Sequence, residues 1–384
     1  MTMRRRKVGR GGPEVGELGL GCMGMSDFYG PADRAESLAT IAAALETGVT
    51  LLDTGDFYGA GHNEMLIAEA LRGRRRENVV LSVKFGALRD PSGGWVGHDA
   101  RPKAVKNFVA YSLKRLRTDY IDIYRPARLD PDVPIEETIG AIADLVKSGY
   151  IRHIGLSEVG AATIRRAAAV HPISDLQIEY SLMVRMIEAE ILPTCRELGI
   201  GVTAYGVLAR GLISGHWSKA RQQAPDTRKS APRFEGQNLE HNLALVEALK
   251  VIARDRGTTV AAIAIAWALA QGPDIVPLVG RAPTRPMGGV FRGLAADPLT
   301  RGHRCDRGRD PEGLGEGRAL PDLRDGASGQ RARMTLAARP RNPTSRASFA
   351  SRRRRSGASG CQSALSSETL PFARRLPSAG RAIS

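Results

Sequence analysis

Short apolar runs alternate with longer amphipathic segments between residues 18 and 280, and this alternation constrains the fold of the 384-residue chain most. A regular succession of strands and helices favours a parallel sheet covered by helices. Eight such units in about 260 residues match the size of a (β/α)8 barrel, also called a TIM barrel. The sequence therefore predicts this fold. The predicted strands are Leu18–Met23, Val49–Thr54, Val79–Phe85, Ile121–Ala127, Arg152–Ser157, Leu176–Tyr180, Gly201–Val207 and Ile275–Val279.

The segment Ala35–Thr47 illustrates the helical pattern between these strands. Apolar residues recur at intervals of three and four, which places them on one face of a helix. Asp33 is suited to cap the start of this helix, and Gly48 is suited to end it. Four further segments show the same pattern, namely Val105–Leu116, Ile135–Val146, Ala161–Val170 and Ile187–Leu198.

A doubly wound sheet with a dinucleotide-binding turn is the alternative fold. The run GLGCMG, with Gly19, Gly21 and Gly24, has the G-x-G-x-x-G spacing. That motif requires a strand before the first glycine and a helix after the turn. Here the first two glycines fall inside the predicted strand, and MSDFYGP follows. The context therefore disfavours this alternative.

Three ionisable side chains indicate acid–base chemistry. Asp53 and Lys84 stand near the ends of the second and third predicted strands, and Tyr58 follows in the next loop. In a (β/α)8 barrel these strand ends carry the active site. A tyrosine has an ordinary pKa of about 10, and a nearby ammonium group lowers that pKa by favouring the phenolate. We expect Asp53 to fix Lys84 beside Tyr58, which gives a tuned proton donor for the reduction of a carbonyl group.

Composition narrows the class of protein. No apolar stretch is long enough for a transmembrane helix, and no apolar segment follows the basic start MTMRRRK, so we expect neither a membrane protein nor a signal peptide. The four cysteines and seven histidines show no metal-ligand spacing. Widely separated cysteines fit a reducing compartment. We therefore predict a cytoplasmic protein without a metal.

The net charge of +16 is concentrated in the last quarter of the chain. Residues 281–384 contain 21 arginines, no lysine and 8 acidic residues, a formal charge of +13, which leaves +3 for residues 1–280. The run SRRRRS at 351–356 is similar to a nucleic-acid patch, but few aromatic residues accompany it. We predict a disordered basic tail and no specific nucleic-acid partner.

The chain resembles the aldo-keto reductases along residues 14–280. The matching segments are LLDTGDFYGAGHNE, VKFG, IRHIGLSEVG, DLQIEYSL and VTAYGVLARGL, in order and spaced across a whole barrel, and GLGCMGMS is typical of bacterial open-chain members. The resemblance implies a (β/α)8 barrel that binds NADPH without a Rossmann domain. It also implies the reduction of an aldehyde or ketone to an alcohol by direct hydride transfer.

The resemblance assigns a role to each matching position. Tyr58 would be the general acid, Lys84 would lower its pKa, and Asp53 would hold Lys84. Ser157 and Gln177 would bind the nicotinamide carboxamide. The remaining cofactor residues would be Tyr205, stacked on the nicotinamide ring, and Gly206, Val207, Leu208 and Arg210, along the ribose and pyrophosphate.

Two positions near the site depart from the family pattern. Ala127 stands where the family usually has a histidine, and alanine can neither donate a hydrogen bond nor relay a proton. Arg125 shares the strand parity of Ala127 and could point inward, so we expect either Arg125 or a water to replace the histidine in part. Glu158 stands where the family usually has asparagine.

The chain also departs from the family after Gly280. Proline and glycine interrupt any helix in the segment RAPTRPMGGVFRG, so we expect the eighth helix to be missing. The abrupt shift in composition is what an out-of-frame translation of a GC-rich gene would give. The predicted domains are a barrel over residues 1–280 and a tail over 281–384. A cofactor-binding or inactive barrel is the alternative to a reductase, while the carbonyl substrate and the oligomeric state stay open.

Overall fold

The computed structural model describes residues 3–26, 32–214 and 232–280. All of them lie in the first of two compact units of the chain, Met1–Arg307. The predicted missing helix, the domain boundary at residue 280 and the predicted tail concern residues outside the described ranges.

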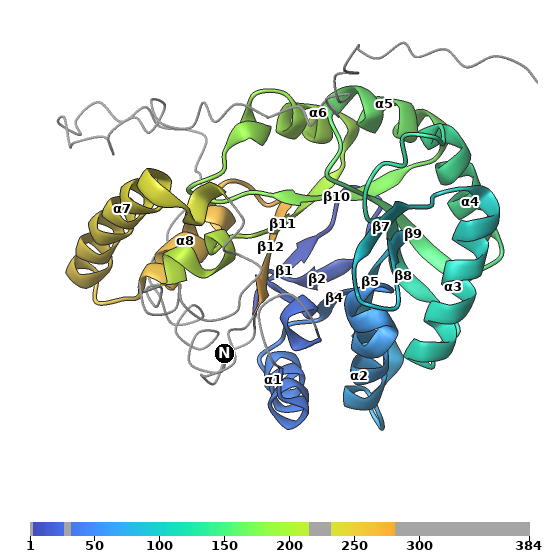
Figure 1. Ribbon diagram of the computed structural model, residues 1–384, viewed down its shortest axis with the longest axis horizontal. Coiled ribbons are helices and arrows are strands. Elements are labelled where there is room, and N and C mark those ends of the chain that lie inside the picture. Colours follow the sequence, from blue (N-terminus) through green and yellow to red (C-terminus); the bar gives the residue numbers. More distant parts are fainter. Residues whose placement is uncertain (1–2, 27–31, 215–231, 281–384) are drawn as a thin grey trace, which may run out of the picture. The chain divides into compact units, whose positions relative to one another are not determined.

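Eight parallel strands form a closed barrel (Figure 1). The barrel closes where β12 pairs with β3, with Leu278 opposite Gly19. This arrangement confirms the predicted TIM barrel, and the doubly wound alternative is wrong. Each predicted strand overlaps one observed strand. Around the barrel the strands are β3 (Gly19–Gly21), β4 (Leu51–Gly55), β5 (Val80–Phe85), β8 (Ile121–Pro126), β9 (Ile151–Ser157), β10 (Ile173–Glu179), β11 (Gly201–Tyr205) and β12 (Ile275–Gly280).

Helices connect successive barrel strands along the chain. The helices are α1 (Arg34–Glu46), α2 (His62–Ala70), α3 (Pro102–Leu116), α4 (Ile135–Lys147), α5 (Ala161–Val170), α6 (Ile191–Leu198), α7 (Gly236–Asp255) and α8 (Val260–Ala270). Among the described residues, both α7 and α8 lie between β11 and β12, whereas each earlier connection holds one α-helix. The Asp33 side chain accepts a hydrogen bond from the backbone N–H of Glu36 at 2.7 Å, which confirms the predicted cap of α1.

The predicted helix Ile187–Leu198 is shorter than expected. Its first residues form a 3-10 turn at Met186–Glu188, and α6 begins only at Ile191. Pro193 then lies in the first turn of α6, where a proline does not remove a helical hydrogen bond. The apolar spacing alone did not mark this boundary.

In the part of the chain that the structure describes, two short hairpins lie outside the barrel sheet. Strands β1 (Arg5–Lys7) and β2 (Glu14–Gly16) pair with each other, and the neighbouring Val8 and Val15 pack with Leu51 and Val276 inside the barrel. This hairpin therefore covers the end of the barrel where the strands begin. Strands β6 (Ala87–Arg89) and β7 (Trp95–His98) form the second hairpin, directly after β5.

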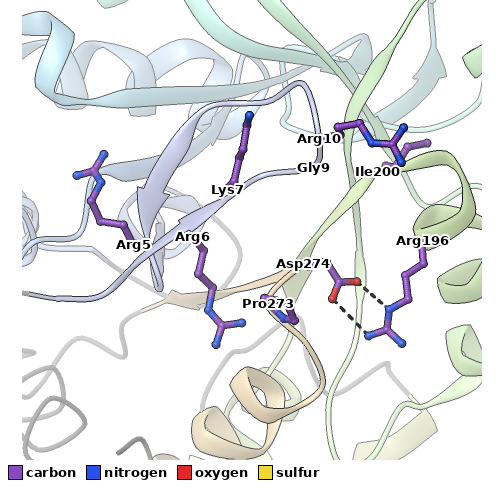
Figure 2. A pocket seen from close by; sticks show the side chains of 10 residues that line it. Arg5, Arg6, Lys7, Gly9, Arg10, Arg196, Ile200, Pro273 and Asp274 are labelled. Atoms are coloured by element: carbon purple, nitrogen blue, oxygen red, sulfur yellow. Dashed lines mark hydrogen bonds and ion pairs between the residues drawn. The ribbon is translucent and has the colours of Figure 1, made fainter. Parts of the chain in front are cut away.

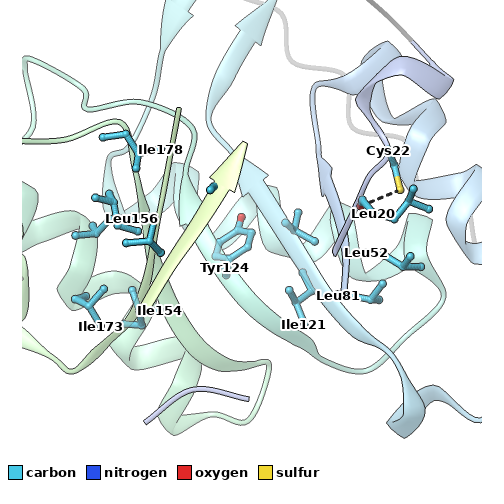
Figure 3. Close-up of a cluster of buried hydrophobic side chains, with 14 of the residues drawn as sticks. Leu20, Cys22, Leu52, Leu81, Ile121, Tyr124, Ile154, Leu156, Ile173 and Ile178 are labelled. Atoms are coloured by element: carbon cyan, nitrogen blue, oxygen red, sulfur yellow. Dashed lines mark hydrogen bonds between the residues drawn. The ribbon is translucent and has the colours of Figure 1, made fainter. Parts of the chain in front are cut away.

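The main apolar core lies between the barrel and its surrounding helices. In Figure 3, Leu52, Leu81 and Tyr124 belong to neighbouring strands and lie in one buried cluster. Because side chains alternate between the two faces of a strand, these residues leave Asp53, Ser82 and Arg125 for the barrel interior. The barrel interior is thus apolar at the end covered by the N-terminal hairpin and charged closer to the carboxyl ends of the strands. No helix in the described ranges is long and apolar enough to cross a membrane.

Candidate active site

Asp53 and Lys84 form a buried ion pair inside the barrel. Asp53 lies in the middle of β4 and Lys84 near the end of β5, and both side chains are 5% exposed. The second carboxylate oxygen of Asp53 accepts hydrogen bonds from Ser82 Oγ at 2.8 Å and from Gln177 Nε2 at 2.6 Å. Asp53 is therefore fixed from β4, β5 and β10, and it fixes the ammonium group in turn.

Tyr58 faces this ion pair from a tight turn after β4. Lys84 Nζ lies 5.1 Å from the centroid of the Tyr58 ring. The turn needs left-handed backbone at three successive residues, ending at Gly61 with φ of 95°. The ring of Phe57 packs edge-on against Tyr58 with 4.8 Å between centroids, so the tyrosine is held in place and is only 5% exposed.

Burial lowers the pKa of Lys84, and the carboxylate of Asp53 opposes this shift. Arg125 adds to the lowering because its positive charge disfavours a second one nearby. A lysine in this environment has one carboxylate partner and a cationic neighbour. The structure thus brings Asp53, Tyr58 and Lys84 together at the end of the barrel where the sequence places them.

Arg125 points into the barrel as predicted, but its contacts differ from the expected ones. Its side chain has no exposed surface and pairs with Asp175, with 3.0 Å between Nη1 and Oδ2. A second nitrogen donates to Ser82 Oγ at 2.8 Å. A guanidinium fully enclosed in this way has no exposed atom for a substrate carbonyl, so it does not take the place of the missing imidazole.

The space for this ion pair exists because β9 carries a glycine there. A Cβ on Gly155 would lie 2.5 Å from Asp175 Oδ1 and 3.1 Å from Arg125 Nε. From the other side, Thr203 Oγ1 donates to Asp175 Oδ2 at 2.5 Å. Four strands, β8 to β11, thus contribute to one buried charged layer directly beside Ser82.

The predicted carboxamide residues lie at neighbouring strand ends. Ser157 on β9 is in register with Gln177 on β10, and both are at most 3% exposed. Tyr205 ends β11 in register with Glu179. Burial and the carboxylate of Glu158 raise the pKa of Tyr205.

Glu158 adopts a left-handed backbone conformation with φ of 54°. Its Oε1 accepts a hydrogen bond from the backbone N–H of Glu179 at 2.9 Å. An acceptor-only carboxylate therefore bridges β9 and β10 beside Tyr205, at the position that departs from the family pattern.

The predicted pyrophosphate segment follows β11 as a succession of tight turns. Gly206 has φ of 68°, and its carbonyl accepts a hydrogen bond from the Ala209 N–H at 2.6 Å. Val207 is buried, Leu208 is half-buried, and Arg210 is exposed with φ of 57°. The arginine therefore lies on the surface at the same end of the barrel as Tyr205.

Apart from the ion pair, apolar side chains pack against Tyr58. Phe57, Ala87 and Ala127 form a small buried cluster with Tyr58, and Met23 packs against it. Trp95 of β7 contacts the Phe57 ring with 5.6 Å between centroids and is 52% exposed. Trp95 thus stands at the rim of the site.

A pocket lies at the opposite end of the barrel. It measures about 420 Å³ and includes Arg10 from the N-terminal hairpin and residues that precede β11 and β12. Figure 2 shows Arg196 directed at Asp274, 2.9 Å away, so this acid already has a cationic partner. None of the predicted site residues lines this pocket, and it is not the candidate active site. Within the described ranges, no group of three or more potential metal ligands occurs.

Comparison with known proteins identifies the family of the chain. The model of the "Aldo/keto reductase family" matches residues 17–287. The chain belongs to the aldo/keto reductase family. A "Probable aldo-keto reductase 1" of Glycine max is 42% identical over 277 residues, which cover 71% of this chain and 79% of that relative.

Solved aldo/keto reductase structures are also similar. The glycerol dehydrogenase AKR11B4 from Gluconobacter oxydans has a TM-score of 0.68 at 28% identity, covering 82% of this chain and all of that one. The holo form of the aldo-keto reductase AKR11C1 from Bacillus halodurans has a TM-score of 0.62 at 28% identity, covering 78% and 92%. The enzymes of this family are oxidoreductases that act on carbonyl groups with nicotinamide cofactors.

Reasoning from the sequence missed the charged layer below the site. Ser82, Gly155 and Asp175 were not singled out, although each stands two residues before a predicted site residue on its strand. Residues two apart on a strand share a face. The position of these residues along their strands therefore indicates that they face the barrel interior, and from the sequence we inferred this for Arg125 only.

Proposed function

We propose that this aldo/keto reductase reduces an aldehyde or ketone to an alcohol with NADPH, and that Tyr58 is the general acid. The observation that carries the proposal is the placement of Tyr58 over the buried Asp53–Lys84 pair, with 5.1 Å between Nζ and the ring centroid. An ammonium group near a phenol favours the phenolate, which makes the phenol a better acid.

The cofactor residues proposed are Ser157, Gln177 and Tyr205, with Gly206, Val207, Leu208 and Arg210 along the ribose and pyrophosphate. Ser157 and Gln177 place a hydroxyl and an amide side by side in register, which suits a carboxamide. One feature fits less well, since Glu158 adds a carboxylate beside Tyr205. We propose NADPH over NADH from the family resemblance.

In the proposed mechanism each side chain has one task. The reduced nicotinamide, when bound, supplies the hydride that adds to the carbonyl carbon. Tyr58 gives its hydroxyl proton to the carbonyl oxygen. The ammonium group of Lys84 stabilises the phenolate that remains, and Asp53 keeps Lys84 within reach.

The alternative is a barrel that binds a cofactor and catalyses little or nothing. Ala127 favours it, because a buried methyl group stands at the position of the family's histidine.

The test measures binding and turnover separately on the full chain. Titration with NADPH and NADH, followed by cofactor fluorescence at high salt, gives the two affinities. Oxidation of NADPH in the presence of a panel of aldehydes and ketones gives turnover. We expect Tyr58→Phe to lower kcat by about 100-fold or more while leaving NADPH affinity within a few-fold, because loss of general acid catalysis typically costs about 10²–10⁴.

Tyr111→Phe is the matched control, since Tyr111 is 56% exposed on α3. It is expected to behave like the unchanged protein. Equal turnover in Tyr58→Phe would exclude Tyr58 as the acid. Tight NADPH binding without turnover on any carbonyl would favour the binding-only alternative.

The remaining proposals concern the setting of the enzyme. Cys22 and Cys195 are buried free thiols, which fits the proposed cytoplasmic location. A small carbonyl compound is the proposed partner, and we propose neither a specific nucleic acid nor a membrane.

A further inference from the structure

We propose that Arg125 is a positioning residue of this reaction centre, which holds Asp53 and Lys84 in place through Ser82 and supplies a second positive charge beside Lys84. The proposal rests on the proposed function, because it assigns Arg125 to the same acid–base site. It gives Arg125 a role different from that of a substitute for the missing imidazole.

A continuous series of contacts connects Arg125 to the ammonium group. Arg125 Nη2 donates to Ser82 Oγ at 2.8 Å, and Ser82 Oγ donates to Asp53 Oδ2 at 2.8 Å. The other oxygen of Asp53 binds Lys84. Arg125 is also the register partner of Lys84, on the neighbouring strand. Hydrogen bonds of this kind are strengthened where water is excluded, and Ser82 and Arg125 have no exposed surface.

Three neighbouring residues hold Arg125 in this position. Asp175 pairs with the guanidinium, Thr203 donates a hydrogen bond to Asp175, and Gly155 leaves the volume that both side chains fill. A fully buried ion pair is not in general more stabilising than apolar residues of the same size. A contribution to stability therefore does not explain why Arg125 and Asp175 are paired here. An electrostatic effect of Arg125 on Lys84 does explain it.

The groups that face Lys84 come from four sides. Asp53 on β4 is the acid, Cys22 follows β3, Arg125 lies on β8, and the ring of Tyr58 covers Nζ. Of these, Arg125 is the group that adds a second positive charge. Two adjacent positive charges favour the ionised form of a phenol more than one does.

The test removes both charges of the pair at once, so that no unpaired charge stays buried. In Arg125→Met/Asp175→Asn, we expect the ionisation midpoint of Tyr58 to rise by about one pH unit, since a neighbouring charge typically shifts a pKa by 1–3 units. The midpoint is read from the ultraviolet absorbance of tyrosinate in cofactor-free protein, as the difference from the same protein with Tyr58→Phe. The pH profile of kcat/KM should shift in the same direction.

Arg125→Lys separates charge from position. It keeps the positive charge but loses the forked contact with Ser82 and Asp175. We expect the Tyr58 midpoint to stay within a few tenths of a unit of the unchanged protein while kcat falls. A midpoint as high as in the double variant would overturn the electrostatic part of the proposal.

Ser82→Ala decides the case if the double variant does not fold, because it removes one oxygen and breaks the link between Arg125 and Asp53. We expect kcat to fall about tenfold, the loss of roughly one hydrogen bond to a charged group. Thr138→Val is the matched control, since it removes a buried hydroxyl that binds the Ala100 carbonyl away from the site. Unchanged kcat and an unchanged pH profile in Ser82→Ala would overturn the positioning role.

Failure of the role proposed for Arg125 and failure of the reductase function give different results in these measurements. The Tyr58 midpoint requires neither cofactor nor substrate. A shifted midpoint in a protein that reduces no carbonyl would support Arg125 and reject the reductase. A double variant with lower thermal stability, an unchanged midpoint and unchanged kcat would assign the pair to folding alone and overturn the proposal.

Discussion

Asp56 lies three residues after Asp53, at the start of the Tyr58 turn, and its side chain is buried. Burial raises the pKa of its carboxyl to about 8, and the nearby carboxylate of Glu64 adds to the shift while Arg115 opposes it. Asp56 Oδ2, Glu64 Oε1 and the Tyr124 hydroxyl are buried without a hydrogen-bond partner. At neutral pH the proton on Asp56 therefore removes one of two facing negative charges.

The raised pKa makes folding less favourable as the pH increases. Below the unfolded-state pKa of about 4 both states carry the proton, so Asp56 causes no loss. Between pH 4 and 8 the unfolded state releases the proton and the folded state keeps it, so the free energy of unfolding falls by up to about 1.4 kcal/mol per pH unit. We expect Asp56→Asn to gain at least about 1 kcal/mol over the unchanged protein between pH 5 and pH 8. Urea unfolding at both pH values measures this, and Asp119→Asn, on the surface, should show no such difference.

At the scale of single residues, the sequence predicts the acid–base residues of the site but not the buried ion pair that lies beside them. Asp53, Tyr58 and Lys84 were recognisable because an acid and a lysine at neighbouring strand ends must meet in a barrel. The pairing of Arg125 with Asp175 depends on the size of the residue between them, Gly155, and on strand register. A single sequence does not state which of several inward polar residues become partners.

Among the elements, α8 illustrates how packing rather than amphipathic pattern defines a helix. Its sequence VAAIAIAWALA is apolar all round, so no hydrophobic face could be read from it, and the helix was not among those predicted. In the structure Ile265 is fully buried, whereas Val251 on α7 is 49% exposed. The short strands of the N-terminal hairpin were missed for a related reason, since RRK and EVG contain too few residues to show alternation.

This difference in burial gives a prediction for stability. Ile265→Ala should lower the free energy of unfolding by about 2–5 kcal/mol, because it removes buried methyl groups and leaves a cavity. Val251→Ala should change it by about 0.5 kcal/mol or less, as surface substitutions usually do. Urea unfolding of both variants measures the pair. Equal losses would show that α8 is not packed against the barrel as described.

At the scale of the whole molecule, charge is distributed unevenly along the chain. Residues 281–384 carry a formal charge of +13, against +3 for residues 1–280. We expect the full chain to bind double-stranded DNA without sequence preference, and the affinity to fall steeply with salt as counterions are released. Fluorescence anisotropy on two unrelated duplexes at about 50 and 200 mM salt tests this, and a range of about 10³–10⁵ in affinity corresponds to 6–10 phosphate contacts. A chain of residues 1–280 is the control and should bind weakly at both concentrations. A preference for one duplex that persists at high salt would contradict the prediction.

The glycine between Arg125 and Asp175 has a consequence for how sequences of this kind can diverge. A side chain at position 155 collides with the ion pair, and the loss of either ion alone leaves a buried charge uncompensated. Single substitutions at these three positions are thus each unfavourable, although a joint replacement by apolar residues fills the same volume. Related barrels should therefore vary at positions 125, 155 and 175 together, as an epistatic set that changes through few viable intermediates.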